Sequence, residues 1–344
     1  MFQYIVRRLL QAIPLFFIIS IVLFFLMRNV GDPLATMGGR KATRSEDRAR
    51  LQCQLGLDQP LYMQYIYWLV GNDWAPARDC NGDGVAEIEG SLRGILRGDL
   101  GMSLTARKPV SEIILEKLGD TLLLMVTAEV VIVLGALVIG IYSALRQYTF
   151  IDNLVTTLSF FGFSMPIFFV ALASMFIFGV TFRRLGLPYF PTSLKFDPRV
   201  GETIPQVLWH MVLPVISISV ISFAAYSRYI RSTMLEVMSQ DYIRTAKSKG
   251  LPRRDIVMIH ALKNASLPIV TIVGLDLPLL LGGAVVTEGI FTWPGMGSAF
   301  LLYVGKGDVA PVMGMLMMIT VAVVVFQILT DMVYAWLDPR IRLE

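Results

Sequence analysis

The segment DYIRTAKSKGLPRRDIVMIHALKNASLP, residues 241–268, is polar and basic and lies between two long apolar runs. Asp241 is a favourable N-cap residue, and Gly250 is the residue type that commonly follows a helix end. Pro252 then fits the first turn of another helix. The segment therefore predicts a short helix, a stop and the start of a second helix.

The predicted short helix has a small apolar stripe. Ile243 and Ala246 lie three residues apart on one face, whereas Arg244, Lys247 and Lys249 make the rest polar and basic. A stripe of this size cannot form a core by itself. We therefore expect it to lie on another surface, either a layer of lipid headgroups or a second protein.

The composition is that of a polytopic membrane protein. The 344 residues are 55% hydrophobic and only 16% charged, and the mean hydropathy is +0.64, far from the values of a soluble domain. The formal net charge is +4, but the basic residues cluster beside apolar runs, as membrane topology requires. Because no nucleic-acid recognition motif accompanies this charge, we expect membrane lipids and no nucleic acid around the chain.

Six apolar runs are long enough to cross a bilayer. The first covers about 28 Å as a helix, which is too long for the apolar region of a signal peptide, and no small-residue cleavage site follows it. Six spans place both termini on the same side of the membrane. The predicted spans are 9–27, 121–145, 154–180, 207–226, 266–288 and 309–333.

Lysines and arginines near the span ends predict which side is cytoplasmic. With the N-terminus inside, the inner segments contain Arg7, Arg8, Arg146, Arg228, Arg231, Arg244, Lys247, Lys249, Arg253, Arg254, Lys263, Arg340 and Arg342. The short outer loops contain only Arg183, Arg184, Lys195, Arg199 and Lys306. Both termini are therefore predicted to be cytoplasmic.

The predicted outer loop, residues 28–117, is too long to be a simple connection. Its segment LGLDQPLYMQYIYWL, residues 55–69, predicts an aromatic-rich helix at the membrane surface or packed on the outer ends of the spans. Contact with an external delivery protein is the alternative. The loop also contains both cysteines, Cys53 and Cys80, which could pair in an oxidising exterior or remain free thiols.

Half of a calcium-binding loop occurs within this outer loop. Residues 79–90 read DCNGDGVAEIEG, with oxygen-bearing side chains at alternate positions and Gly84 at the sharp turn. Position twelve should carry a bidentate carboxylate but is Gly90, so an ordinary polar turn is the alternative. The candidate calcium ligands are Asp79, Asn81, Asp83, Val85 through its carbonyl, and Glu87.

Ionisable residues within the spans are functional candidates. Asp276 is deepest in the fifth span, where three glycines and Pro278 predict close or irregular helix packing. Glu288 lies near the end of the same span. We take Asp276 and Glu288 as candidates for a transport pathway. For Asp276 and for Glu129 of the second span, a hydrogen bond to a neighbouring helix is the alternative. Pro166 and Pro214 predict kinks in the third and fourth spans.

The sequence contains no G-x-x-x-x-G-K-[ST] phosphate loop, no nucleophile elbow and no H-E-x-x-H motif. It therefore shows no chemistry of its own, and we expect the chain not to be an enzyme. A transporter of this kind needs either an ion gradient or a separate motor. The alternatives to a motor-driven permease are a gradient-driven transporter with its ion site at Asp276 or Glu129, and a receptor whose outer loop senses calcium.

Six segments occur in a recognisable order: GDPL at 31–34, LGLDQPLYMQYIYWL at 55–69, RGDLGMSL at 97–104, DYIRTAKSKG at 241–250 followed by HALKNASLP, TEGIFTWPGMG at 287–297, and the tail LDPRIRLE. Together they resemble the permease subunits of bacterial dipeptide and oligopeptide ABC importers, specifically the B-type subunit. The resemblance covers nearly the whole chain. Residues 72–96 depart from it, because such permeases usually have few residues at this point, and the calcium-like half-motif lies inside this insertion.

The resemblance implies a type I ABC importer permease fold with six transmembrane helices, in the bacterial inner membrane. It also implies a sister permease, two ATPase subunits that bind ATP and Mg²⁺, and an extracytoplasmic substrate-binding protein. Residues 1–27 would hold the N-terminal tail and first helix, and 28–117 the extracytoplasmic loop with its insertion, 72–96. Residues 118–344 would form a five-helix core with a cytoplasmic coupling loop, 228–265.

In that family a cytoplasmic helix with the signature E-A-A-x-x-x-G docks on the ATPase subunit. Spacing back from Gly250 aligns the signature with residues 244–246, so only Ala246 and Gly250 match and arginine replaces the acid. The residues assigned to ATPase coupling are Ile243, Arg244, Thr245, Ala246, Lys247 and Gly250. The resemblance implies import of di- or oligopeptides, with nickel complexes, glutathione and oligosaccharides as the alternative cargoes.

Overall fold

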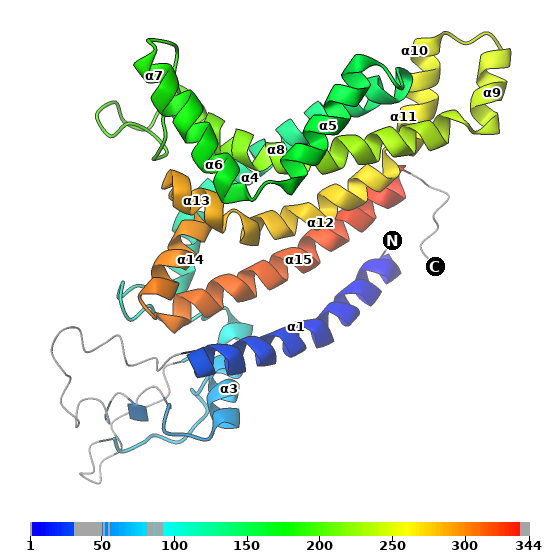
Figure 1. The fold of residues 1–344 in the computed structure, drawn as a ribbon. Coiled ribbons are helices and arrows are strands. Elements are labelled where there is room, and N and C mark those ends of the chain that lie inside the picture. The colour runs from blue at the N-terminus through cyan, green and yellow to red at the C-terminus, as the bar shows by residue number, and fades with distance from the viewer. Residues whose placement is uncertain are drawn as a thin grey trace. The chain divides into compact units, whose positions relative to one another are not determined.

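The computed structural model describes residues 2–30, 50, 52–53, 56–80, 86 and 92–337. These residues form helices and loops, with no β-strand in the described ranges, so the predicted all-α fold class is confirmed (Figure 1). The α-helices are α1 (Phe2–Val30), α3 (Leu61–Val70), α4 (Val110–Leu145), α5 (Phe150–Ser164), α6 (Ile167–Ser174), α7 (Phe182–Arg184), α8 (Ile204–Met238), α9 (Asp241–Ser248), α10 (Arg253–Asp255), α11 (Leu262–Ala265), α12 (Leu267–Gly283), α13 (Val285–Phe291), α14 (Met296–Gly305) and α15 (Val309–Leu337). Two π-helical segments, Met175–Thr181 and Ile256–Ala261, continue α6 and α10.

The helices belong to two compact units. The first unit contains Met1–Arg8, Gly119–Ser298 and Ala322–Glu344, and the second contains Leu9–Leu118 and Ala299–Val321. The boundaries between the units fall inside α1, α4, α14 and α15, so these helices contribute residues to both.

Long apolar helices account for the predicted spans. α1, α4, α8, α15 and the stretch Ile167–Arg184 are each long and apolar enough to cross a bilayer. Arg253–Ala265 and Pro268–Leu277 meet the same criterion together, as one span with a bend of 50°. The part of the chain that the structure describes thus holds five candidate spans, or six with the bent pair, and the polytopic helical fold is confirmed.

The third predicted span, 154–180, is broken near its middle. α5 ends at Ser164, Met165 has an extended backbone with ψ 133°, and Pro166 is the N-cap of α6. Proline cannot donate the backbone hydrogen bond that would continue α5, and it disfavours the helical conformation of the residue before it. The membrane-length stretch therefore begins at Ile167, and α5 lies along α8 instead (Figure 1).

The fifth predicted span, 266–288, is divided between α12 and α13, with Ala284 between the two helices. A side chain at Gly274 of α12 would overlap Thr330 of α15. Only glycine allows the two helix backbones to approach this closely. The close packing predicted from the glycines of this span is confirmed at Gly274.

The core of the first unit is formed mainly by α4, α8, α12 and the segments that follow α9. Trp293, fully buried, joins this core and donates a hydrogen bond of 2.9 Å from its indole nitrogen to the Asp120 carbonyl. Large apolar side chains such as Val138 and Leu275 are exposed on the long helices. A soluble protein rarely leaves so much apolar surface uncovered, whereas lipid covers it in a membrane.

In the second unit, α3 packs on α1. The Tyr65 and Ser20 hydroxyl groups are 2.8 Å apart, and the Phe24 ring lies 5.6 Å from the Trp68 ring. Pro60 is the N-cap of α3, where its missing N–H costs nothing. The aromatic-rich segment therefore forms a helix that packs on α1, which agrees with one of its two predicted placements, and contact with a delivery protein stays a prediction.

The predicted insertion, residues 72–96, is closed at its base. The Asn72 backbone N–H donates to the Leu92 carbonyl at 3.0 Å, and the Leu92 N–H donates to the Asn72 side-chain oxygen at 2.9 Å. Gly71 and Gly94 have positive φ angles, and a side chain on either would collide with the backbone of the other arm. The two ends of the predicted insertion are therefore joined by hydrogen bonds and by close backbone contact.

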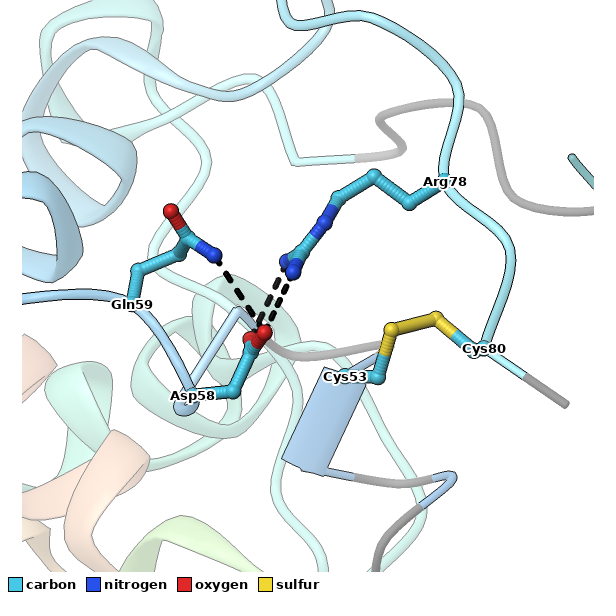
Figure 2. Close-up of a disulfide and its surroundings, with 5 residues drawn as sticks. All are labelled: Cys53, Asp58, Gln59, Arg78 and Cys80. Atoms are coloured by element: carbon cyan, nitrogen blue, oxygen red, sulfur yellow. Dashed lines mark hydrogen bonds and ion pairs between the residues drawn. A yellow bond between two sulfur atoms is a disulfide. The ribbon is translucent and has the colours of Figure 1, made fainter. Parts of the chain in front are cut away.

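A disulfide joins Cys53 and Cys80, whose Cα atoms are 5.6 Å apart (Figure 2). The two cysteines are therefore paired, which decides between the alternatives left open by the sequence. Beside the disulfide, the Arg78 guanidinium forms an ion pair with Asp58, and its hydrogen bonds lower the pKa of the Asp58 carboxyl group (Figure 2).

We expect Cys53 and Cys80 to react with a thiol-alkylating reagent only after reduction. Closing a loop with a sequence separation of 27 residues stabilises the folded loop by about 3.5 kcal/mol in the chain-entropy description. The mass of the intact protein should therefore rise by two alkyl groups with reductant and by none without it. Two alkyl groups in unreduced, freshly isolated protein would contradict the pairing.

Candidate functional site

The segment that organises the sequence folds as a short helix followed by a tight turn. α9 begins at Asp241, one residue earlier than predicted, and Gln240 is its N-cap. Gly250 follows the C-cap residue and has a φ angle of +76°, the conformation that favours glycine at this position. Pro252 is the N-cap of α10. The predicted short helix, stop and second start are confirmed, but Asp241 is the first residue of α9 and not its N-cap, and Pro252 is an N-cap and not a first-turn residue.

The apolar stripe of α9 is covered by the chain itself. Ile243 is fully buried and Ala246 is only 6% exposed, in the same core as Ile256 and Val257 of the π-helical segment. The expectation that this stripe lies on lipid or on another protein is therefore wrong. The turn at Gly250 folds the following segment back against α9, and that segment supplies the apolar surface that α9 lacks.

The opposite face of α9 is open. Arg244, Thr245, Lys247 and Gly250 are exposed, and the Arg244 side chain is 74% exposed. On the same helix, the Tyr242 hydroxyl accepts a 3.0 Å hydrogen bond from the Asn264 amide of α11. Of the six residues assigned to coupling, two thus anchor the helix and four are available to a partner.

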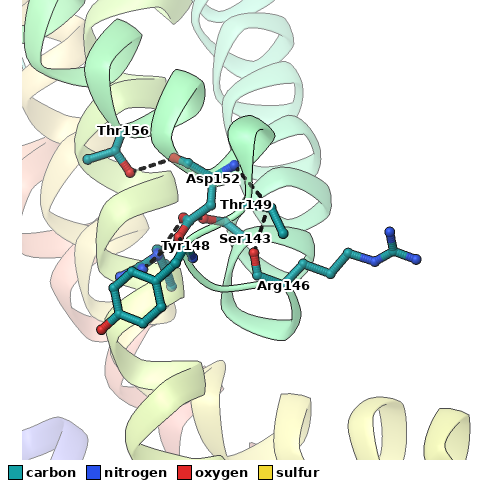
Figure 3. A network of polar contacts seen from close by, with 7 residues as sticks. Ser143, Arg146, Tyr148, Thr149, Asp152 and Thr156 are labelled. Atoms are coloured by element: carbon teal, nitrogen blue, oxygen red, sulfur yellow. Dashed lines mark hydrogen bonds and ion pairs between the residues drawn. The ribbon is translucent and has the colours of Figure 1, made fainter.

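A buried ion pair fixes the turn between α4 and α5 onto α8. Asp152, 2% exposed, accepts two hydrogen bonds of 2.9 Å from the Arg231 guanidinium. Its carboxylate also accepts from the Ser143 hydroxyl and, at 2.8 Å, from the Tyr148 backbone N–H (Figure 3). Thr149 caps the N-terminus of α5 through a hydrogen bond from the Asp152 backbone N–H (Figure 3).

The hydrogen bonds from Arg231 lower the pKa of Asp152 to about 2, and those from Ser143 and Tyr148 act in the same direction. Burial opposes this change, but the bidentate guanidinium outweighs it. The Asp152 carboxylate is therefore charged and fully hydrogen-bonded at neutral pH. It holds α4, α5 and α8 together at one end of the first unit.

The α9–α10 segment reaches this same end. The Arg253 guanidinium donates a 3.4 Å hydrogen bond to the Leu145 carbonyl at the C-terminus of α4, and α9 and α10 lie beside each other there (Figure 1). A force on α9 would therefore act on α4, through Arg253 and through the buried stripe.

The pairing of Asp152 with Arg231 was not predicted from the sequence. Arg231 was identified only as a basic residue on the cytoplasmic side, and Asp152 was not among the candidate residues. One signal was present: threonine three residues before an acid, T149-x-x-D152, resembles the pattern that begins a helix. The pairing with Arg231 joins positions that are 79 residues apart, and no local pattern predicts such a contact.

Two ionisable residues of the spans meet at a tyrosine. The Tyr226 hydroxyl oxygen lies 2.9 Å from the Glu129 carboxyl group and 2.9 Å from the Asp276 carboxyl group. Both acids thus make the hydrogen bond to a neighbouring helix that was given as the alternative, and the pathway role of Asp276 stays a prediction. Tyr226 itself was not among the predicted site residues.

Glu288 lies in a different environment. It is fully buried, accepts from the Thr121 hydroxyl at 2.7 Å and accepts from the Ser298 backbone N–H at 3.0 Å. A side chain at Gly295 would overlap its carboxyl group. Glu288 therefore fixes the turn between α13 and α14, and no described hydrogen bond joins it to Asp276.

Most of the calcium half-motif lies outside the described residues. Asn81, Asp83, Val85 and Glu87 all fall there, so the predicted calcium site stays a prediction. Asp79 alone of the candidate ligands is described. Within the described ranges, no three acidic, histidine or cysteine side chains are grouped as metal ligands.

Two known family models together match nearly the whole chain. Residues 136–343 match the family described as binding-protein-dependent transport system inner membrane component. Residues 1–125 match the N-terminal region of such membrane components. Together the two matches include α9, the α4–α5 turn and five of the six predicted spans in full, and both ends of the second span, 121–145.

Curated relatives match over their full length. The oligopeptide transport system permease protein AppB of Bacillus subtilis (strain 168) is 36% identical, over 99% of this chain and 100% of the relative. The di/tripeptide transport system permease protein DppB of Pseudomonas aeruginosa is 33% identical, and the dipeptide transport system permease protein DppB of Escherichia coli (strain K12) is 32% identical, each over 99% of both chains. This chain therefore belongs to the family of inner membrane components of binding-protein-dependent transport systems.

Proposed function

We propose that this chain is one permease subunit of an ATP-driven importer of di- or oligopeptides, and that it forms half of the translocation pathway. The peptide permeases that match its full length support the cargo class. The observation that carries the coupling is α9, an eight-residue helix with an open polar face and a buried anchor. The proposed partners are a sister permease, two ATPase subunits that bind ATP and Mg²⁺, and an extracytoplasmic substrate-binding protein.

We propose that α9 and both termini are cytoplasmic. The distribution of lysine and arginine supports this orientation. The hydrogen bond between Arg253 and the Leu145 carbonyl also supports it, because the α4–α5 turn and the α9–α10 segment share one membrane face in the proposed orientation. The disulfide between Cys53 and Cys80 then lies outside the cytoplasm, where disulfides persist. The division into residues 1–27, 28–117 and 118–344 is part of the same proposal.

In the proposed mechanism, closure of the ATPase subunits moves α9. Ile243 and Ala246 transmit this movement to the π-helical segment, and Arg253 transmits it to α4. The Asp152–Arg231 pair makes α5 and α8 follow α4 as one body. Rigid elements of this kind convert a local push into a change between two states of a bundle, and the coupling is reciprocal.

Asp276 is the proposed pathway residue, because its side chain is partly exposed on a span. Glu288 would join the pathway only in a state that opens its hydrogen bonds to Thr121 and Ser298. Glu129 lies outside this proposal.

ATP-dependent peptide uptake tests the proposed function. The chain is reconstituted in proteoliposomes with the proposed sister permease, the two ATPase subunits and the substrate-binding protein. We expect uptake of labelled peptides that needs ATP inside and fails when any subunit is omitted. Uptake by the chain alone under a pH gradient would instead identify a gradient-driven transporter. ATP-dependent uptake of a nickel complex, glutathione or an oligosaccharide, without peptide uptake, would correct the cargo.

A further inference from the structure

Three helices of the first unit meet at one buried polar cluster. Glu129 of α4 and Tyr226 of α8 are 5% and 2% exposed, and Asp276 of α12 is partly buried. The Tyr226 hydroxyl oxygen is 2.9 Å from Glu129 Oε1 and 2.9 Å from Asp276 Oδ2. Both distances are those of good hydrogen bonds between oxygen atoms.

The number of protons in this cluster follows from its geometry. A phenol carries one hydrogen, so Tyr226 donates to only one of the two carboxyl groups. If Glu129 and Asp276 were both ionised, the second carboxylate would face the phenol oxygen with no hydrogen between two acceptors. A proton on that carboxyl group turns this contact into a donated hydrogen bond, and both 2.9 Å contacts are then satisfied.

The charge of the surroundings leads to the same count. The titratable groups that meet here from α4, α8 and α12 are Glu129, Tyr226 and Asp276, and neither acid has an ion-pair partner in the described part of the chain. Glu129 Oε2 is buried without a hydrogen-bond partner. An unpaired charge at this depth is far more costly than a neutral carbonyl oxygen.

We propose that Glu129, Tyr226 and Asp276 form a buried proton-binding site, which holds one proton between the two carboxyl groups in the described conformation. Separation of α4, α8 and α12 would hydrate the acids and release the proton. The site thus favours the assembled conformation when protons are abundant. In this proposal the proton site does not replace ATP as the energy source of transport. The proposal also does not depend on which solute crosses the membrane.

Infrared spectroscopy of the full chain in lipid nanodiscs tests the site. At neutral pH we expect a C=O stretching band of a protonated carboxyl group that shifts in D₂O. Glu129→Gln and Asp276→Asn should each remove it, since an amide N–H replaces the shared proton and leaves the other acid ionised. The matched control is Glu116→Gln, which removes an exposed acid of the same helix, paired with Lys108 at 2.9 Å, and should keep the band. No such band in the wild type, or a band that persists in both variants, overturns the proposal.

The pH dependence of thermal unfolding gives a second readout that does not require assigning a band. Suppose that the folded protein holds one proton more than the unfolded protein. The ratio of folded to unfolded protein then falls about tenfold for each pH unit above the ordinary pKa range of carboxyl groups. The melting temperature of the wild type should therefore fall relative to that of Glu129→Gln between about pH 5 and about pH 8. The same pH dependence in both proteins overturns the proposal. Both readouts succeed or fail independently of peptide uptake.

Discussion

Ala246→Asp is expected to abolish ATP-dependent uptake while the protein remains in the membrane. Ala246 is buried with Ile243 against the π-helical segment that follows α10. Burial of Ile243 stabilises the attachment of α9 by about 2–3 kcal/mol, whereas an unpaired buried carboxylate costs several kcal/mol. The helix should therefore detach from its own chain and no longer transmit force.

Two measurements separate this outcome from general misfolding. Uptake should fall to the background of the empty proteoliposome, and limited trypsin digestion should cut faster at Lys247. The matched control is Ser248→Asp, which places the same charge on the exposed face of α9 and should keep wild-type resistance to trypsin. Normal uptake by Ala246→Asp would contradict the role of α9.

Arg231→Gln is expected to destabilise the protein at neutral pH by about 2–4 kcal/mol, because it leaves the buried Asp152 carboxylate without its counter-charge. The lower part of this range allows for the partial exposure of Arg231, since solvent screens its charge. The measurement is the thermal unfolding of the purified chain in detergent. An unchanged melting temperature would show that the pair does not hold the α4–α5 turn.

The same pair predicts the response to acid. The pKa of Asp152 is lowered to about 2 by its hydrogen bonds from Arg231, so the stabilisation is complete above the ordinary carboxyl pKa of about 4. It is lost as the pH falls from about 4 to about 2, where the folded protein takes up this proton. Asp152→Asn should lack this part of the acid response. An identical loss of stability in both proteins over this range would contradict the assignment.

The sequence predicts the elements whose causes are local. Long apolar runs identify the spans, because the bilayer requires their length and composition. Gly250 ends α9 in the conformation that favours glycine. The aromatic-rich helix α3 follows Pro60, and it packs on α1 as expected.

The sequence fails where a contact links distant positions. Asp152 pairs with Arg231, and Tyr226 joins Glu129 to Asp276, through contacts that depend on how whole helices pack. Hydropathy alone gave 154–180 as one span, because an apolar window does not register a missing backbone donor, whereas Pro166 correctly predicted the interruption of this span.

The burial of the apolar stripe of α9 could not be predicted from α9 alone for the same reason. Ile243 and Ala246 were expected to need an external surface because the helix was considered without its successor. The turn at Gly250 brings Ile256 and Val257 over them, and the stripe becomes an anchor. The face left for a partner is therefore the polar one.

Cysteine cross-linking from α9 to the ATPase subunits tests the central claim most directly. Single cysteines replace Lys247, which is exposed, or Ile243, which is fully buried, in membranes that also contain the sister permease and both ATPase subunits. A short thiol-to-amine cross-linker should join residue 247, and not residue 243, to an ATPase subunit identified by mass spectrometry. Absence of that product from position 247, with both ATPase subunits present and active, would contradict coupling through α9.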